Sequence, residues 1–237
     1  MNKASALICT VLLLAATMAS CSGGKNKAAV QPLAGYAAHA TYEGIDVSRH
    51  QKVIDWDKVG ADNNITFVYI KATEGATLVD SCYRNNVNGA RRKGIKVGAY
   101  HYFTTKSSVN AQVKNFVRQL KSVHQDLIPM IDVETRGNWS RSQLIDSLSK
   151  MAVSLEKTFK RKPMIYSTME FYNDNLAPHF NAYPLYIARY SNARPTIKWN
   201  GKHTIWQFTE DGIVTGISKK VDLCRFNKGI TLDDIKL

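Results

Sequence analysis

The sequence predicts an α/β fold, a reduced and flattened (β/α) barrel of about eight strands with fewer helices in its last third. Eight short apolar segments rich in Val, Ile, Tyr and Phe recur after residue 42. Helical patterns separate the earlier segments, whereas only short gaps separate the last three. A full barrel takes about 250 residues, more than residues 42–237 provide, and the missing helices account for the difference. An open doubly wound sheet is the alternative, although no Gly-x-Gly-x-x-Gly follows the first strand.

The predicted strands are largely apolar along their whole length, without strict alternation of apolar and polar residues. Such runs are typical of strands that are covered on both faces, as in a parallel sheet. The eight segments are residues 44–47, 67–73, 97–103, 127–134, 164–168, 185–190, 204–208 and 221–226.

Three helices are predicted between the earlier strands. Residues 82–93 form the first, which ends at Gly94, a common helix stop signal. In residues 108–123 apolar side chains recur at three- and four-residue spacing, as on one face of a helix. The third begins at Ser140, which forms a capping box pattern with Gln143, and runs to about residue 160.

The first twenty residues indicate export. Lys3 precedes an apolar stretch over residues 4–16, which is too short to span a membrane and is followed by small residues and Cys21. This pattern resembles a bacterial lipoprotein signal, in which the cysteine is lipidated; a plain cleaved signal with an incidental cysteine is the alternative. We therefore expect a protein that is anchored by lipid to a bacterial membrane and faces the periplasm or the cell exterior. The predicted organisation is a signal over residues 1–20, a lipidated Cys21 and flexible tether over residues 21–41, and one folded domain over residues 42–237.

Composition and charge limit the classes of function. The 237 residues are 44% hydrophobic and 22% charged, which excludes a disordered, fibrous or many-spanning membrane chain. Lys and Arg number 32 against 19 Asp and Glu, and the net charge of +13 favours an anionic partner. Nucleic acid is not expected, because neither a basic aromatic strip nor a recognised binding module is present. Nothing in the sequence requires more than a monomer.

No metal or other cofactor is expected. The sequence contains none of the Cys-x-x-Cys, His-Glu-x-x-His or EF-hand spacings. Of the four cysteines, only Cys82 and Cys224 lie in the predicted domain, and an oxidising compartment would permit a disulfide between them. The sequence does not place their Cα atoms, so this pairing stays open.

Acidic side chains gather at the ends of the predicted strands, where barrel enzymes place their reactive groups. Asp132 and Glu134 end one strand, and because residues two apart share a face, both are expected in one pocket. Two nearby carboxylates do not ionise together easily, so one keeps a proton and acts as a general acid. Glycoside hydrolysis uses such an acid together with a second group near the sugar carbon. Taken alone, Asp-x-Glu is a common string, and two solvated loop carboxylates are the other interpretation.

Aromatic residues occur at the same strand ends. Tyr100, Tyr102 and Tyr166 lie toward the ends of predicted strands, and sugar rings present apolar faces that pack on aromatic rings. For any one of these residues, core filling is the simpler interpretation. His101 is likewise expected to be a hydrogen-bonded structural histidine.

With these residues in place, residues 42 to about 227 resemble glycoside hydrolase family 25, the muramidase-type lysozymes built on a modified β/α barrel. Each motif is short, but their order and spacing cover nearly the whole predicted domain. The motifs are Gly44-Ile45-Asp46-Val47-Ser48 with Gln51, Lys71-Ala72-Thr73-Glu74-Gly75 with Asp80, Gly98-Ala99-Tyr100-His101-Tyr102, Pro129-Met130-Ile131-Asp132-Val133-Glu134, Ile165-Tyr166-Ser167, Trp206-Gln207-Phe208 and Val221-Asp222-Leu223.

The resemblance implies a role for each matching residue. Glu134 would be the proton donor, and Asp132 would stabilise the transition state or orient the N-acetyl group of the substrate. Asp46 and Asp222 would complete the acidic floor of the pocket. The residues implied to shape the sugar site are Glu74, Tyr100, Tyr102, Tyr166 and Gln207.

The resemblance also implies the reaction, cleavage of the β-1,4 bond between N-acetylmuramic acid and N-acetylglucosamine in the glycan strands of peptidoglycan. An acid and an orienting group on one strand face suit assistance by the substrate's own acetamide better than direct attack by water. Lys52 and Cys224 depart from the family pattern, which bears on substrate fit more than on catalysis. Two other functions are open: a lipid-anchored wall-binding protein without activity, and a hydrolase of another N-acetylated glycan such as chitin.

Overall fold

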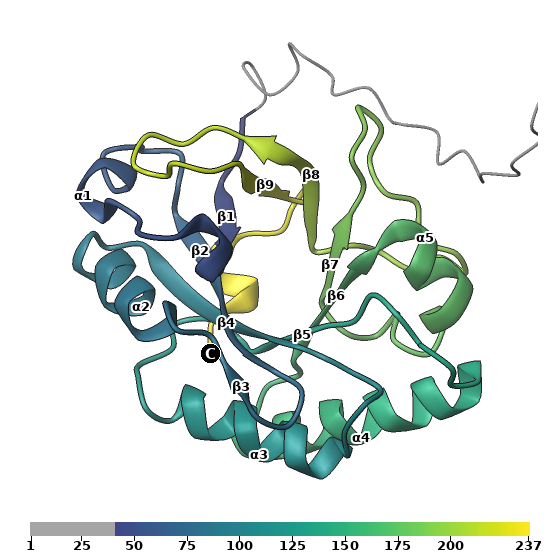
Figure 1. Ribbon diagram of the computed structural model, residues 1–237. Coiled ribbons are helices and arrows are strands. Elements are labelled where there is room, and N and C mark those ends of the chain that lie inside the picture. The colour runs from purple at the N-terminus through teal and green to yellow at the C-terminus, as the bar shows by residue number, and fades with distance from the viewer. Residues whose placement is uncertain (1–40) are drawn as a thin grey trace, which may run out of the picture. The chain divides into compact units, whose positions relative to one another are not determined.

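The computed structural model describes residues 41–237, which form a closed barrel of eight strands with one short strand added at its side (Figure 1). Strand β1 pairs with both β2 and β9, and this double pairing closes the sheet. The predicted reduced barrel is confirmed. The predicted signal and Cys21 lie outside the described residues. The strands are β1 Gly44–Val47, β2 Phe67–Glu74, β3 Leu78–Val79, β4 Lys96–Tyr102, β5 Met130–Asp132, β6 Met164–Thr168, β7 Leu185–Ala188, β8 Ile205–Gly212 and β9 Val221–Phe226.

The sheet is mixed, whereas its apolar runs indicated a wholly parallel sheet. Neighbouring strands from β1 through β2 and β4 to β8 are parallel, but β9 runs antiparallel to both β8 and β1. The reason is the short connection over residues 213–220, which permits a hairpin but not the longer crossover that a parallel strand needs. Strand β9 is still largely apolar because both the barrel interior and the outer layer cover it.

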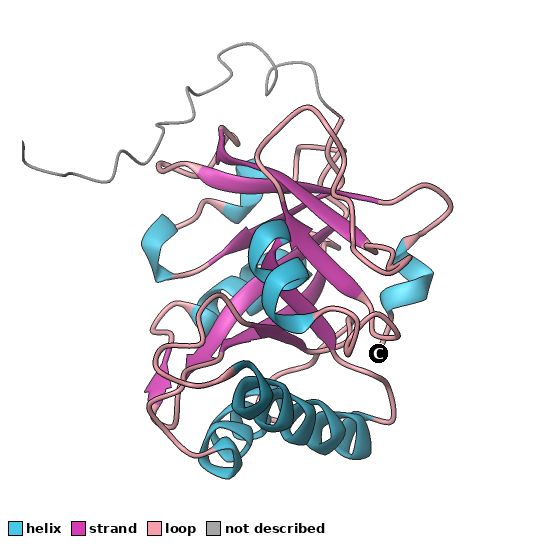
Figure 2. Cartoon of the chain, turned by 90° about the vertical axis from the view of Figure 1, so that its right-hand side faces the viewer, coloured by secondary structure: helices cyan, strands magenta, loops and turns pink. Residues whose placement is uncertain are grey.

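Helices are concentrated in the first two thirds of the described chain, as predicted. The two longest, α3 and α4, lie together on one side of the barrel (Figures 1 and 2). Helix α4 begins with the predicted capping box: Gln143 N donates to Ser140 Oγ at 3.2 Å, and Ser140 N donates to Gln143 Oε1 at 2.8 Å. The helices are η1 Arg49–Gln51, α1 Trp56–Val59, α2 Tyr83–Arg92, α3 Val109–Leu120, α4 Arg141–Phe159, α5 Met169–Phe171, the π-helical η2 Tyr172–Leu176 and η3 Leu232–Ile235.

Apolar side chains fill two layers, one between the strands and the helices and one inside the barrel. The inner layer contains Phe67, Tyr69 and Tyr186, all fully buried, so the interior is a packed core and not a pore. Helix η3 closes one end, where Ile235 joins the inner layer (Figure 1). The other end stays open at the carboxyl ends of the parallel strands. No helix in residues 41–237 is long and apolar enough to cross a membrane.

Candidate active site

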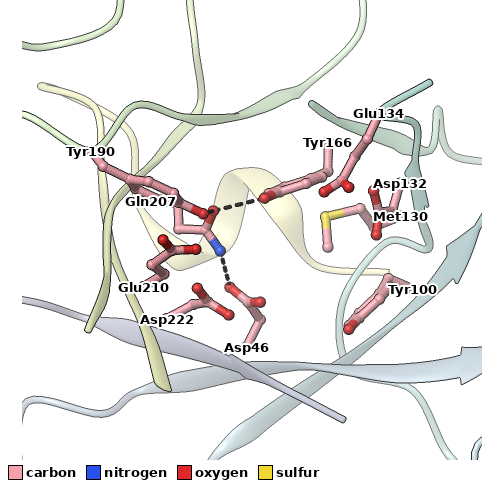
Figure 3. A pocket seen from close by; sticks show the side chains of 10 residues that line it. All are labelled: Asp46, Tyr100, Met130, Asp132, Glu134, Tyr166, Tyr190, Gln207, Glu210 and Asp222. Atoms are coloured by element: carbon pink, nitrogen blue, oxygen red, sulfur yellow. Dashed lines mark hydrogen bonds between the residues drawn. The ribbon is translucent and has the colours of Figure 1, made fainter. Parts of the chain in front are cut away.

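A pocket of about 230 Å³ occupies the open end of the barrel. Its walls carry five of the 19 acidic residues of the chain, together with tyrosines and one glutamine (Figure 3). This is the end at which barrel enzymes place their reactive groups. The lining residues are Asp46, Tyr100, Met130, Asp132, Glu134, Tyr166, Tyr190, Gln207, Glu210 and Asp222.

The carboxylates stand on two opposing walls. Figure 3 shows Asp132 and Glu134 on one side and Asp46, Asp222 and Glu210 on the other. Strand β5 ends at Asp132, two residues earlier than predicted. Glu134 nevertheless reaches the pocket, because the Val133 N–H donates to the Tyr166 carbonyl at 3.0 Å and so continues the β5–β6 pairing.

Asp46, which is buried, and Asp222, which is partly exposed, form a pair of interacting carboxyls. Tyr186 Oη and Gln207 Nε2 donate to Asp46 Oδ2 at 2.7 and 3.0 Å, and these bonds counteract the rise in the pKa of Asp46 that burial causes. Burial, and then the charge of Asp46, raise the pKa of Asp222 to about 10. Asp222 therefore keeps its proton at neutral pH, and the hydrogen bond between the two carboxyls lowers the pKa of Asp46.

Gln207 connects this pair to the aromatic wall. Its Oε1 accepts hydrogen bonds from Tyr166 Oη at 2.8 Å and Tyr190 Oη at 3.2 Å, while its Nε2 donates to Asp46. The side chain is 1% exposed, so these three contacts fix its orientation without water.

Asp132 and Glu134 differ in exposure, although they belong to the same wall. Asp132 is buried, and burial followed by the charge of Glu134 raises its pKa well above the usual range. Its Oδ1 has no hydrogen-bond partner within residues 41–237. Glu134 is exposed at the rim, yet the surrounding walls and then the charge of Asp46 raise its pKa as well. Together they offer a solvent-accessible carboxyl whose pKa is raised and a buried oxygen that has no donor among the described residues.

Two of the predicted sugar-site residues, Glu74 and Tyr102, are not among the pocket-lining residues. They form the wall beside it: Tyr102 lies opposite Asp132 in the β4–β5 pair and opposite Glu74 in the β2–β4 pair. Lys71 Nζ forms an ion pair with Glu74 at 2.7 Å and lies 5.0 Å from the centre of the Tyr102 ring. Burial and then the charge of Glu134 raise the pKa of Tyr102 to about 12.

Sequence reasoning missed three lining residues, Met130, Tyr190 and Glu210. Tyr190 lies beyond the end of β7, and counting by twos from Tyr186 indicates its inward direction. Glu210 is inward because β8 has an irregular register between Gln207 and Thr209, and one extra residue reverses the alternation of side chains. No sequence pattern identifies that irregularity in advance.

The remaining candidates lie away from the pocket. His101 is buried between Thr73 Oγ1 at 2.7 Å and Gln112 Oε1 at 3.0 Å, which confirms its structural role. Cys82 and Cys224 are free thiols, the first partly exposed and the second buried inside the barrel. Lys52 is exposed and does not line the pocket. Residues 41–237 contain no group of three or more His, Cys, Asp or Glu side chains arranged to hold a metal ion.

Comparison with known proteins gives consistent matches over this region. The model of the glycosyl hydrolases family 25 matches residues 45–217. The uncharacterized protein YegX of Escherichia coli strain K12 is 40% identical over 197 residues, which are 80% of this chain and 71% of YegX. The autolytic lysozyme of Clostridium acetobutylicum is 32% identical over 188 residues, 79% of this chain and 56% of the lysozyme. The structure of a family 25 glycosyl hydrolase from Bacillus anthracis aligns with a TM-score of 0.71 and 32% identity, covering 79% of this chain and 91% of that one.

Proposed function

Because the chain belongs to glycosyl hydrolase family 25 and is therefore a glycosidase, we propose that it hydrolyses peptidoglycan. The bond cleaved is the β-1,4 bond between N-acetylmuramic acid and N-acetylglucosamine. The names of related proteins support this choice, since they include an autolytic lysozyme from Clostridium acetobutylicum and Lysozyme M1 from Streptomyces globisporus. The net charge of +13 also suits a polymer whose lactyl groups and stem peptides carry carboxylates.

The observation that carries the mechanism is the contrast between Glu134 and Asp132. Glu134 reaches solvent with a raised pKa, so it suits the general acid that protonates the leaving oxygen. Asp132 offers the buried Oδ1 that has no donor among the described residues. An N–H group of the substrate's acetamide is the donor that this oxygen needs.

Such an N–H donor also decides where the proton of the pair resides. A hydrogen bond to the ionised carboxylate lowers the pKa of Asp132, because it stabilises the charged form. The proton shared by the pair then stays on Glu134, next to the bond to be cleaved. Substrate binding therefore keeps Glu134 protonated, which is the form that donates a proton to the leaving oxygen.

The bond changes follow from this arrangement. The acetamide oxygen attacks the sugar C1, the C1–oxygen bond breaks, and its electron pair goes to the leaving oxygen, which takes the proton from Glu134. Water then attacks C1 and gives a proton to the Glu134 carboxylate, which restores the acid and the acetamide. Two displacements at one carbon retain the anomeric configuration.

The other lining residues bind and orient the sugar. Tyr100 and Tyr166 offer rings on which the apolar faces of a pyranose pack. Gln207 holds Tyr166 and Tyr190 in place, and the pair of Asp46 and Asp222 keeps one negative charge below the reacting carbon. Glu74 and Tyr102 form the neighbouring wall, where an extended glycan passes.

We further propose that the protein is exported and anchored by lipid at Cys21, outside the described residues. A tether of about twenty residues reaches tens of ångströms, by roughly 5–6 Å × √n, so hydrolysis would be confined to wall close to the membrane. We expect the enzyme to act as a monomer.

The test is digestion of purified peptidoglycan with the wild-type protein and the Glu134→Gln variant, with fragments identified by mass spectrometry. Muropeptides with reducing muramic acid ends, absent from the variant, are expected. Glu170→Gln makes the same chemical change at an exposed position on α5 and serves as the matched control. NMR of the first-formed product should show the retained anomer, and the inverted anomer would overturn assistance by the acetamide.

Other outcomes select the rival functions. Reducing glucosamine ends would indicate cleavage of the other glycosidic bond. Release of fragments from chitin but not from peptidoglycan would change the substrate. Binding to peptidoglycan by a folded protein that releases nothing from any glycan would favour a wall-binding role, and full activity of Glu134→Gln would remove Glu134 as the acid.

A further inference from the structure

Lys71 is a largely buried cation in the layer of side chains that surrounds the candidate active site. Tyr69 belongs to the inner layer of the barrel, and alternation along β2 places Lys71 on the same side, one step closer to the open end. The Lys71 side chain is 13% exposed. A lysine withdrawn from water to this extent needs compensating partners, because its charge loses hydration.

Two neighbours supply that compensation and hold the ammonium in place. Glu74 Oε2 lies 2.7 Å from Lys71 Nζ, and the face of the Tyr102 ring lies 5.0 Å away. Tyr102 is in turn directly opposite Asp132 in the β4–β5 pair. Lys71 is thus fixed next to the wall that carries Asp132 and Glu134, with the Glu74 carboxylate as its ion-pair partner.

We propose that Lys71 is a positioning residue of the active site, whose ammonium stabilises the negative charge shared by Asp132 and Glu134. This inference rests on the proposed function, since it assigns Lys71 to the same reaction. The pair must hold one proton for Glu134 to donate and one charge for Asp132 to orient the acetamide. Lys71 favours that singly ionised state over the doubly protonated one.

The surroundings of the pair explain why a cation is needed there. In the part of the chain that the structure describes, the groups that face the pair are carboxyls and tyrosines, and Lys71 is the one cation among them. Its charge lowers the pKa of both carboxyls and opposes burial. The facing groups are Asp46 from β1, Lys71 and Glu74 from β2, Tyr100 and Tyr102 from β4, Tyr166 from β6, Tyr190 after β7, Glu210 from β8 and Asp222 from β9.

The experiment compares the pH profiles of kcat and KM for Lys71→Met, Lys71→Arg and Glu74→Gln on soluble peptidoglycan fragments. Lys71→Met should move the pH optimum upward by about one unit and lower kcat at the acid side about tenfold. Lys71→Arg keeps the charge and should keep the profile. Glu74→Gln removes the opposing charge that raises the pKa of Asp132, so its profile should move toward lower pH.

Opposite shifts of the pH profile in Lys71→Met and Glu74→Gln would show that Lys71 acts on the charge of the carboxyl pair and does not only stabilise the fold. A uniform loss of kcat at every pH in both variants would overturn the proposal, because it would report lost packing. A higher KM with an unchanged profile would also overturn it, because Lys71 would then bind a carboxylate of the substrate.

A second readout does not depend on turnover. Carbon-13 NMR of labelled Asp and Glu carboxyls should show the Asp132 and Glu134 titrations at higher pH in Lys71→Met. Unchanged titrations would overturn the role of Lys71 whatever the substrate is. Absence of muropeptide release by the wild-type protein, with shifted titrations, would instead contradict the proposed function alone.

Discussion

Asp46 and Asp222 lie directly opposite each other in the antiparallel β1–β9 pair, at the upper edge of the packed barrel interior. Tyr186 and Gln207 donate to Asp46 and stabilise its charged form, whereas burial and the charge of Asp46 raise the pKa of Asp222 to about 10, so Asp222 keeps its proton. This arrangement makes the stability of the fold depend on pH, because an unfolded chain releases the same proton at a much lower pH.

Asp222→Asn should reduce the loss of stability at alkaline pH. The folded protein keeps the Asp222 proton up to a pKa of about 10, whereas the unfolded chain releases it near pH 4. The unfolded state binds fewer protons in that window, so the free energy of unfolding falls as pH rises, by up to about 1.4 kcal/mol per pH unit. Asparagine resembles the protonated carboxyl but does not titrate. Urea unfolding at pH 5 and pH 8 should give a shallower decline for the variant, and an equal decline would contradict the assignment of the proton.

Gln207→Glu should destabilise the fold more at pH 8 than at pH 5. The introduced carboxyl can still accept from Tyr166 and Tyr190, but once ionised it loses the donor to Asp46 and repels its charge. The loss of a buried hydrogen bond costs about 1–3 kcal/mol. At pH 5 the introduced group keeps a proton and donates it, so the cost is smaller. Thermal unfolding at the two pH values measures this difference, and the same loss at both would argue against a contact with Asp46.

Much of the site follows from the sequence because the apolar segments mark the strands that carry its residues. The predicted bounds of the strands that contain Asp46, Tyr166 and Asp222 agree with the observed bounds. This agreement was enough to place the three residues at one end of a barrel. The direction of β9 was predicted wrongly, because burial on both faces produces the same apolar run in parallel and antiparallel strands.

The parts that the sequence did not predict depend on single contacts. Glu210 faces the pocket only because an extra residue in β8 reverses the alternation. Glu74 does not line the pocket, and its carboxylate forms an ion pair with Lys71, three residues earlier. Neither a register irregularity nor an ion pair leaves a periodic signal, so the sequence does not predict the position of either residue.

Cys82 and Cys224 should differ sharply in reactivity. Cys82 is partly exposed at the start of α2, whereas Cys224 is buried inside the barrel, where burial raises the pKa of its thiol well above the usual range. Alkylation depends on the thiolate and on access, so native protein should be labelled at Cys82 and spared at Cys224. Peptide mapping after iodoacetamide treatment measures this, with urea-unfolded protein as the control in which both react. A disulfide-linked peptide containing both residues would contradict the separation of the two thiols.

His101→Gln should lessen the sensitivity of the fold to acid. Burial lowers the pKa of His101 to about 4, from the usual value near 6.5, while Thr73 and Gln112 occupy its two ring nitrogens. In this case the unfolded state binds the extra proton, so the free energy of unfolding falls as pH drops below about 6.5. The loss down to pH 4.5 amounts to about 2 kcal/mol.

The glutamine variant lacks this titration. It should be less stable than the wild type at pH 7, because the buried contacts with Thr73 and Gln112 are altered, yet it should lose less stability between pH 7 and pH 4.5. Part of the acid sensitivity should persist, since burial also lowers the pKa of His203 to about 4. Urea unfolding at both pH values distinguishes the two effects. The altered contacts lower the free energy of unfolding at pH 7, and the missing titration reduces its change between pH 7 and pH 4.5. If the variant lost as much stability as the wild type on acidification, His101 would have to be protonated already in the folded wild-type protein. With a proton on both ring nitrogens, His101 would still donate to Gln112 Oε1, and Thr73 could act only as an acceptor.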